Sequence, residues 1–260
     1  MTEQAIIYER EGPVVTITLN RPSVHNALTA EMIRSLTEIG REYDRDETAR
    51  ALVLTGAGER AFCTGRDLRS SWSESGTSPG GRHEAHRPEE RIFSEVEKPV
   101  IAAVNGHALG GGAELVLGTD IRVASDQATF GFPEVTLGLV PYGGAQVRVP
   151  QQVPWAKAME MLLTGRRYSA AEALSMGLVN YVLPQDAVLG AAHDLAEQVA
   201  RNAPLAVRRI KKAVRRVYNQ EFAEAFRAEW AIAAEALTTQ DAREGITAFL
   251  EKRPPVFRGR

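Results

Sequence analysis

The segment best suited to take part in chemistry combines three consecutive glycines, Gly110 to Gly112, with a carboxylate, Glu114. Glycine is costly to order, so this run indicates a close approach of the backbone to another group. The apolar run Val100 to Val104 predicts a strand before the glycines, and the apolar residues after Glu114 predict a helix. Backbone N–H groups at such a junction point at whatever docks there. The alternative is an ordinary glycine-rich turn whose glutamate complements the helix dipole.

Two more segments carry groups that suit the same kind of site. A second carboxylate, Glu134, ends the sequence Phe130-Gly131-Phe132-Pro133-Glu134. A companion backbone site lies within the segment from Ala61 to Leu68, where Gly65 and Arg66 follow the apolar residues Ala61 to Cys63. The alternative for Glu134 is that it merely starts a helix behind Pro133.

With these motifs, the chain resembles the crotonase superfamily of acyl-CoA enzymes, the enoyl-CoA hydratases and isomerases. The further matching segments are Val14 to Pro22, Asn26 to Leu28, Leu163 to Gly165, Ala171 to Ala173, Gly177 to Val179 and Phe249 to Arg253. The resemblance implies an α/β fold, the crotonase (ClpP-like) spiral of repeated ββα units. It further implies that residues 1–200 form the spiral core, with CoA and the active site, and that residues 201–260 form a helical trimerisation region.

Composition excludes several classes of function. The 260 residues carry a formal net charge of −2, which gives no overall reason to expect binding to nucleic acid or a membrane. The single cysteine, Cys63, cannot form an internal disulfide. No segment approaches the ~20 apolar residues of a membrane span, and Met1 to Gln4 do not resemble the start of a secretory signal. We therefore expect a cytoplasmic location.

Hydrophobic periodicity predicts alternating strands and helices. Val14 to Leu19 alternates like a half-buried strand, Met32 to Tyr43 has helical spacing, and Ala51 to Thr55 predicts a buried strand. Strands are also predicted at Val100 to Val104 and Ile121 to Ala124. This order favours mostly parallel strands but does not distinguish a doubly wound sheet from the spiral that the resemblance implies.

Two regions outside these elements have their own character. Ser70 to Pro88 is rich in Ser, Gly and Pro and is predicted to be a long mobile loop, which in the family lies near the acyl pocket. From Pro204 to about Leu250 the pattern is helical. The resemblance implies that this helical end packs between subunits of a homotrimer, often paired into a hexamer.

The resemblance assigns a role to each of the motifs. The backbone N–H groups of Arg66 and Gly111 would form an oxyanion hole for the thioester oxygen. Glu114 would activate water as a carboxylate, and Glu134, held protonated, would deliver a proton to the α-carbon. The residues expected to contact substrate or CoA are Val24, Ala27, Arg66, Asp67, Leu68, Arg69, Gly111, Phe249 and Lys252. Arg66 stands where many family members have a small residue, so its guanidinium is expected to meet a CoA phosphate or an acidic acyl group, or else solvent.

Competing signals are weaker. Gly76 to Gly80 matches a serine-nucleophile pattern but has no strand before it. The histidines show no metal-ligand spacing beyond the His83 and His86 pair, so no metal is expected. A basic run lies on one predicted helix, and we expect its charges to be solvated while the apolar side packs inward. The basic residues are Arg208, Arg209, Lys211, Lys212, Arg215 and Arg216, and the apolar ones are Val207, Ile210, Val214 and Val217.

The sequence thus predicts an enoyl-CoA hydratase-like lyase that acts on an acyl-CoA thioester without a metal or redox cofactor, CoA being part of the substrate. Family members with only one of the two glutamates tend to catalyse other reactions, so the presence of both Glu114 and Glu134 favours hydration. The alternatives are a carnitinyl-CoA-type dehydratase, an enoyl-CoA isomerase or an acyl-CoA hydrolase. From another class, the alternative is a non-catalytic protein that binds RNA through the basic helix face.

Overall fold

The computed structural model describes residues 4–68, 92–93, 95–219, 227, 229–231, 234 and 237–256. The strands are β1 (Ile6–Glu11), β2 (Val14–Leu19), β3 (Ala51–Gly56), β4 (Ala61–Cys63), β5 (Val100–Val104), β6 (His107–Leu109), β7 (Ile121–Ser125), β8 (Thr129–Gly131), β9 (Tyr168–Ser169) and β10 (Tyr181–Leu183). The α-helices are α1 (Ala30–Arg45), α3 (Gly111–Leu117), α4 (Ala145–Gln152), α5 (Trp155–Thr164), α6 (Ala170–Ser175), α7 (Val188–Ala200), α8 (Pro204–Asn219) and α10 (Gln240–Glu251). The 3₁₀ helices are η1 (Pro22–Val24), η3 (Pro133–Leu137) and η4 (Gln185–Ala187).

From β3 to β8, successive strands alternate between two sheets. One sheet has the order β1-β2-β3-β5-β7-β10, and the other has the order β4-β6-β8-β9. Each of β3, β5 and β7 lies in the first sheet, and the strand that follows it lies in the second. Neighbours pair in parallel except β1 with β2 and β8 with β9. Repeated passage from one sheet to the other, with helices between, is the predicted spiral of ββα units.

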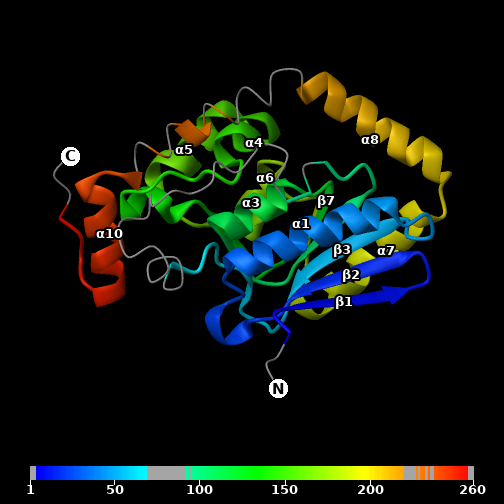
Figure 1. Ribbon diagram of the computed structural model, residues 1–260, viewed down its shortest axis with the longest axis horizontal. Helices are drawn as coiled ribbons and strands as arrows, with labels where there is room; N and C mark the ends of the chain where they lie inside the picture. Colours follow the sequence, from blue (N-terminus) through cyan, green and yellow to red (C-terminus); the bar gives the residue numbers. More distant parts are fainter. Residues whose placement is uncertain are drawn as a thin grey trace.

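The central strands β3 and β5 of the larger sheet are buried on both faces, and the side chains of β3 alternate between two cores. Leu52 and Leu54 of β3 join the main core with α1, whereas Ala51 and Val53 pack with α7. Figure 1 shows α7 behind this sheet and α1 in front of it. Strand β2 was predicted to be half-buried, but α7 covers its second face and Thr16 is only 9% exposed.

The predicted junction at the glycines has one more element than the sequence suggested. The strand Val100–Val104 does not lead directly into the glycines, because β6 intervenes and crosses into the second sheet. The glycines then lead into α3, with Gly110 as its N-cap and Glu114 in its first turn. Three-residue strands give too short a periodic signal for sequence reading to detect.

Helix α8 turns its basic side toward its own chain. Nζ of Lys211 lies 2.6 Å from the Asp120 carboxylate and donates to the Lys98 carbonyl at 2.7 Å. Arg215 donates to the Val96 carbonyl at 2.6 Å. The expectation that these charges are solvated is therefore wrong for Lys211 and Arg215, whereas Arg209 and Lys212 are exposed as expected. Periodicity identifies two faces of a helix but not which face meets an acidic surface.

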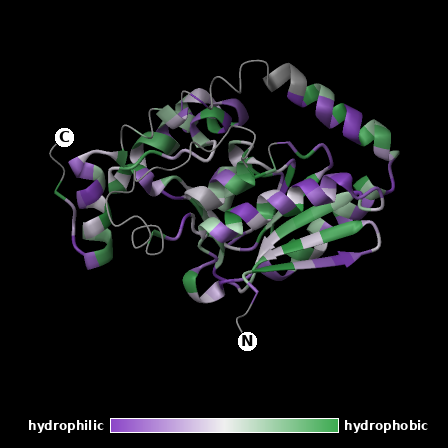
Figure 2. Cartoon of the chain, viewed as in Figure 1, coloured by the Kyte–Doolittle hydropathy of each residue, from purple (hydrophilic) through white to green (hydrophobic). Residues whose placement is uncertain are grey.

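The apolar side of α8 lies on the outside of the chain. Ile210 is 66% exposed and Val214 is 52% exposed, so the prediction that they pack inward is wrong for the single chain. Figure 2 shows this helix, at the upper right, with hydrophobic and hydrophilic residues alternating along it. The side chains of Arg216, from the predicted basic face, and Val217, from the predicted apolar face, lie outside the described part of the structure.

Helix α10 packs against η3 with very little space between the two backbones. A methyl group on Gly245 would lie 2.1 Å from the Leu137 carbonyl oxygen, and one on Gly138 would lie 2.7 Å from that of Asp241. In Figure 1, α10 stands at the opposite end of the molecule from α8. Through this contact the C-terminal segment supports the short helix that carries Glu134. No helix among the described residues is long and apolar enough to cross a membrane.

Candidate active site

Residues of α1, α3, η3, α4 and α10 and of the loop after β4 enclose, with others, a cavity of about 210 Å³. The cavity brings together five predicted site residues, which are Arg66, Leu68, Gly111, Glu114 and Glu134. Most of the remaining wall is apolar: Leu28, Ile33, Ile92, Leu115, Pro133, Leu137, Leu139, Val140, Pro141, Leu237 and Ile246. Such a mostly apolar cavity with a few convergent polar groups is typical of a small-molecule site.

Glu114 projects from the first turn of α3 and is 8% exposed. Its Oε1 accepts a hydrogen bond from the backbone N–H of Ala145 at 3.0 Å. A methyl group on Gly143 would lie 2.2 Å from its Oε2, so any larger residue there would displace the carboxylate from this position. A backbone N–H donor favours the charged form of a carboxyl, which suits a base.

Glu134 has a different environment. Pro133 fixes the start of η3 and Glu134 follows in its first turn, so the helix-start alternative describes its backbone but not its side chain. Its Oε2 is buried with no hydrogen-bond partner among the described residues. Burial, and secondarily the neighbouring Glu114, raise the pKa of Glu134 to about 8. The two carboxyls therefore share one cavity in unlike environments.

Two backbone segments meet beside these carboxyls. Gly65 has a φ of +94°, which favours glycine, and a methyl group on it would lie 3.1 Å from the Gly111 nitrogen. A methyl group on Gly111 would lie 3.6 Å from the Arg66 nitrogen. The close approach that the glycine run predicted is thus made by the loop after β4. The backbones of Arg66 and Gly111 thus lie close together, and both residues line the cavity.

The Arg66 side chain lines the cavity rather than facing bulk solvent. Its Nη1 donates to the Tyr142 hydroxyl at 2.8 Å, and the guanidinium carbon lies 5.6 Å from the centre of the Tyr142 ring. The Trp230 ring packs edge-on against the Tyr142 ring, and the two ring centres are 5.3 Å apart. Burial raises the pKa of Tyr142, so its hydroxyl stays protonated at neutral pH.

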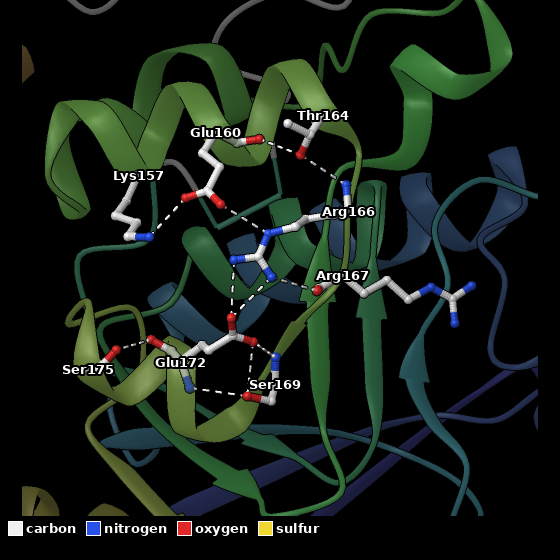
Figure 3. A network of polar contacts seen from close by, with 8 residues as sticks. All are labelled: Lys157, Glu160, Thr164, Arg166, Arg167, Ser169, Glu172 and Ser175. Atoms are coloured by element: carbon white, nitrogen blue, oxygen red, sulfur yellow. Dashed lines mark hydrogen bonds and ion pairs between the residues drawn. The ribbon is translucent and has the colours of Figure 1, made fainter.

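A network of ion pairs on the surface surrounds the turn between α5 and β9 (Figure 3). Arg166 bridges Glu160 of α5 at 3.1 Å and Glu172 of α6 at 3.0 Å. The turn includes Gly165, where a methyl group would lie 2.8 Å from Thr136 of η3. The network therefore fixes the turn against which the Glu134 helix rests.

The other predicted contact residues do not line the cavity. Ala27 and Asp67 are joined by Arg21, whose Nη1 donates to the Ala27 carbonyl at 2.7 Å and to the Asp67 carboxylate at 3.0 Å. Val24 and Phe249 are 39% and 54% exposed. Lys252 caps the C-terminus of α10 with a φ of +56°, and its CoA contact stays a prediction together with those of the other four. Arg69, the 70–88 loop, the Gly76 to Gly80 pattern and the His83 and His86 pair lie outside the described residues.

Sequence reasoning missed the segment Pro141-Tyr142-Gly143-Gly144. It supplies the hydroxyl that holds Arg66 and the glycine that makes room for Glu114. The signal was present, because a glycine pair beside an aromatic residue indicates close packing much as the triple glycine does. Ala145, which follows directly, contributes its backbone N–H to Glu114.

Comparison with known proteins gives one consistent family. The family model described as enoyl-CoA hydratase/isomerase matches residues 9–260. An enoyl-CoA hydratase, EchA19 of Mycobacterium tuberculosis, is 39% identical over 98% of this chain and 96% of its own. A carnitinyl-CoA dehydratase of Citrobacter koseri is 39% identical over 99% of both chains.

Solved structures show the same likeness in three dimensions. The crystal structure of a carnitinyl-CoA hydratase from Mycobacterium avium superimposes with a TM-score of 0.88 at 38% identity. That match covers 100% of both chains.

Proposed function

Because the chain belongs to the enoyl-CoA hydratase/isomerase family and is a hydro-lyase, we propose that its reaction is the reversible addition of water to a trans-2-enoyl-CoA, which gives a 3-hydroxyacyl-CoA. The observation that carries this proposal is the pair of unlike carboxyls in one cavity. Glu134 has a pKa raised to about 8, while Glu114 accepts a backbone hydrogen bond. Addition of water to a double bond requires one group that removes a proton and one that supplies it.

In the proposed mechanism Glu114 is the base. Its carboxylate takes a proton from a water molecule as that water attacks the β-carbon of the substrate. The backbone N–H of Ala145 orients the carboxylate through a hydrogen bond to Oε1. Glu134 then donates its proton to the α-carbon, and its burial keeps that proton in place at neutral pH.

The thioester oxygen gains negative charge as the enolate forms. In this proposal the backbone N–H groups of Arg66 and Gly111 stabilise that charge. One such donor is typically worth about 3 kcal/mol in the transition state. Their close approach, enforced by Gly65, supports this role. The carboxyls of the chain supply both acid and base, so the proposed step needs no cofactor besides the CoA moiety of the substrate.

The direct test is hydration of crotonyl-CoA, followed by the loss of its thioester-conjugated absorbance. The parent protein should hydrate it, whereas Glu114→Gln and Glu134→Gln should each lose about 10²-fold or more in turnover. Glu38→Gln, an exposed change on α1, serves as the matched control. A parent that consumes no enoyl-CoA, or a Glu114→Gln variant with parental turnover, would contradict the proposal.

The relatives named carnitinyl-CoA dehydratases raise a second candidate, the dehydration of a trimethylammonium-bearing acyl group. The Arg66 guanidinium already occupies the face of Tyr142, the nearest aromatic position in the cavity for a quaternary ammonium. A second cation there would meet a like charge, which favours simple hydration over this candidate. Product analysis by mass spectrometry with carnitinyl-CoA and crotonyl-CoA separates the two, and it also reveals isomerase or hydrolase products.

The proposed assembly is a homotrimer or hexamer. Three apolar side chains on the outer side of α8, Leu205, Ile210 and Val214, are 62%, 66% and 52% exposed, which supports burial between subunits. Light scattering should give a mass of three or six chains, and Ile210→Ser should reduce it. Inward docking of Lys211 and Arg215 weighs against the RNA-binding alternative. A cytoplasmic location stays a prediction.

A further inference from the structure

The loop that follows β2 is bonded to the backbone on both sides of Arg66. The Leu28 N–H donates to the Gly65 carbonyl at 2.8 Å, and the Asp67 N–H donates to the Leu28 carbonyl at 2.9 Å. Leu28 and Arg66 thereby form an isolated parallel bridge between two segments that belong to neither sheet. The loop therefore fixes the backbone immediately before and immediately after Arg66.

This bridge sets the direction of the Arg66 N–H. The peptide between Gly65 and Arg66 is trans, and a trans peptide holds its C=O and its N–H in opposite directions. Because the Gly65 carbonyl points at Leu28, the Arg66 N–H points away from the loop. The same nitrogen lies close to the start of α3, since a methyl group on Gly111 would be 3.6 Å from it. The loop thus determines where one of the two proposed oxyanion donors points.

Asn26 anchors this loop in the core, where its side chain is fully buried. Its Oδ1 accepts from the Arg21 N–H at 2.9 Å, and its Nδ2 donates to the carbonyls of Ala57 at 3.0 Å and Ala61 at 2.8 Å. One N–H partner and two carbonyl partners require a carboxamide, because a carboxylate or an apolar side chain would leave buried polar groups unmatched. Asn26 therefore ties the loop to the turn after β3 and to β4, the strand that leads to Arg66.

The backbone at Asn26 has an uncommon conformation. Its φ is +57°, and the φ of His25 is +55°. The left-handed region is costly for residues other than glycine, and asparagine tolerates it better than most. Such conformations persist where the surrounding structure determines them. Here the His25 carbonyl accepts from the Thr64 N–H at 3.2 Å, so this turn too is bonded to the loop after β4.

Arg21 closes the bridge from the solvent side. Its Nη1 donates to the Ala27 carbonyl at 2.7 Å and to the Asp67 carboxylate at 3.0 Å. Ala27 precedes Leu28 and Asp67 follows Arg66, so this guanidinium joins the two bridged segments. The side chain is 26% exposed, and its replacement does not open the core.

Resting on the oxyanion role proposed above, we propose that Asn26 and Arg21 are positioning residues of the reaction. Together they hold residues 21–28, whose backbone aims the Arg66 N–H at the thioester oxygen. Both act through the Leu28 to Gly65 hydrogen bond rather than by contact with the reacting atoms. Loss of either lets the peptide between Gly65 and Arg66 turn, which weakens donation to the developing oxyanion.

The test measures polarisation of the thioester carbonyl at saturating ligand, so a change in CoA affinity does not enter. The probe is 4-(dimethylamino)cinnamoyl-CoA, whose absorption band moves to longer wavelength when its carbonyl oxygen accepts hydrogen bonds. The parent should shift this band. A parent that does not shift it would overturn the oxyanion role and this inference with it. A parent that shifts the band but does not hydrate crotonyl-CoA would refute the hydration function alone, and the variants would still decide the roles of Asn26 and Arg21.

Two variants test the two side chains. Asn26→Gly removes all three side-chain hydrogen bonds, and glycine adopts a φ of +57° without strain. It should reduce the band shift to about half or less, and turnover by about 10- to 100-fold, since a misplacement of about 1 Å costs that much. Arg21→Met should act in the same direction with a several-fold loss of turnover. A parental band shift in Asn26→Gly, or in Arg21→Met if the first variant does not fold, would overturn the proposal.

Tyr43→Phe is the matched control for a general loss of stability. The buried Tyr43 hydroxyl donates to the Pro99 carbonyl at 2.8 Å, so this change also removes a buried hydrogen bond to the backbone. Tyr43 lies roughly 15 Å along α1 from Ile33 of the cavity wall. The control should lower the melting temperature and keep the parental band shift. If it loses as much of the shift as Asn26→Gly, the proposal is overturned, because the effect is then a general loosening of the fold.

Discussion

Replacement of Glu134 by glutamine should stabilise the protein while it abolishes catalysis. The carboxyl is buried, and its pKa of about 8 in the folded protein exceeds its ordinary value of 4.5. A group whose folded pKa is raised binds its proton more tightly in the folded state. Its contribution to stability is therefore fully present below about pH 4.5 and is lost as the pH rises toward 8. Glutamine has nearly the same shape and does not ionise, so it avoids this loss.

The magnitude follows from the interval between the two pKa values. Each pH unit within it corresponds to about 1.4 kcal/mol. The gain from Glu134→Gln should be about 1 kcal/mol near pH 5, roughly 3 kcal/mol near pH 7 and roughly 5 kcal/mol above pH 8. Urea unfolding of parent and variant across this range, at one protein concentration, measures the difference.

A difference that is constant with pH, or a variant that is less stable at pH 8 than the parent, would refute the assignment of a protonated buried carboxyl. Glu38→Gln on the surface of α1 provides the control, because an exposed carboxyl should give no such pH dependence. The same proton predicts the alkaline limb of catalysis. Turnover of the parent should fall as the pH rises through about 8, since the ionised form of Glu134 cannot donate a proton.

Three other predictions follow from particular contacts. Gly111→Ala fits the fold because its methyl group would meet only ordinary contacts, 3.5 Å from Gly65 and 3.6 Å from the Arg66 nitrogen. It should keep the parental melting temperature yet lose about 10²-fold in turnover, because the methyl group occupies space beside the oxyanion donors. Gly111→Pro should be at least as inactive, since proline is tolerated at this first position of α3 but has no N–H, and substantial turnover would exclude this donor. Lys211→Met should lower the free energy of unfolding by about 1–3 kcal/mol, because it removes the hydrogen bonds that Lys211 donates to Asp120 and to the Lys98 carbonyl. Arg209→Met, at an exposed position of the same helix, is the control and should have little effect. Equal stability of these two variants would refute the docking role of the basic face.

Local sequence determined much of this protein. The β-branched and apolar runs specified β3 and β5, since each is buried on both faces and gives a continuous hydrophobic signal. The triple glycine predicted a close approach of two backbone segments. The motifs around Glu114 and Glu134 identified these two residues as candidate catalytic carboxyls. Each of these features is encoded by residues that are adjacent in sequence, so each pattern can be read along the chain.

Only the tertiary structure decided how distant residues meet. The pKa of Glu134 depends on burial and on Glu114. The position of the Arg66 guanidinium depends on its hydrogen bond to Tyr142, 76 residues away in sequence. The orientation of α8 was decided in the same way, because both of its faces have a regular pattern and Asp120 on a separate segment fixes the basic one. Sequence gives the period of a helix and the chemistry of each side chain, whereas burial and charge pairing are properties of the surfaces that folding brings together.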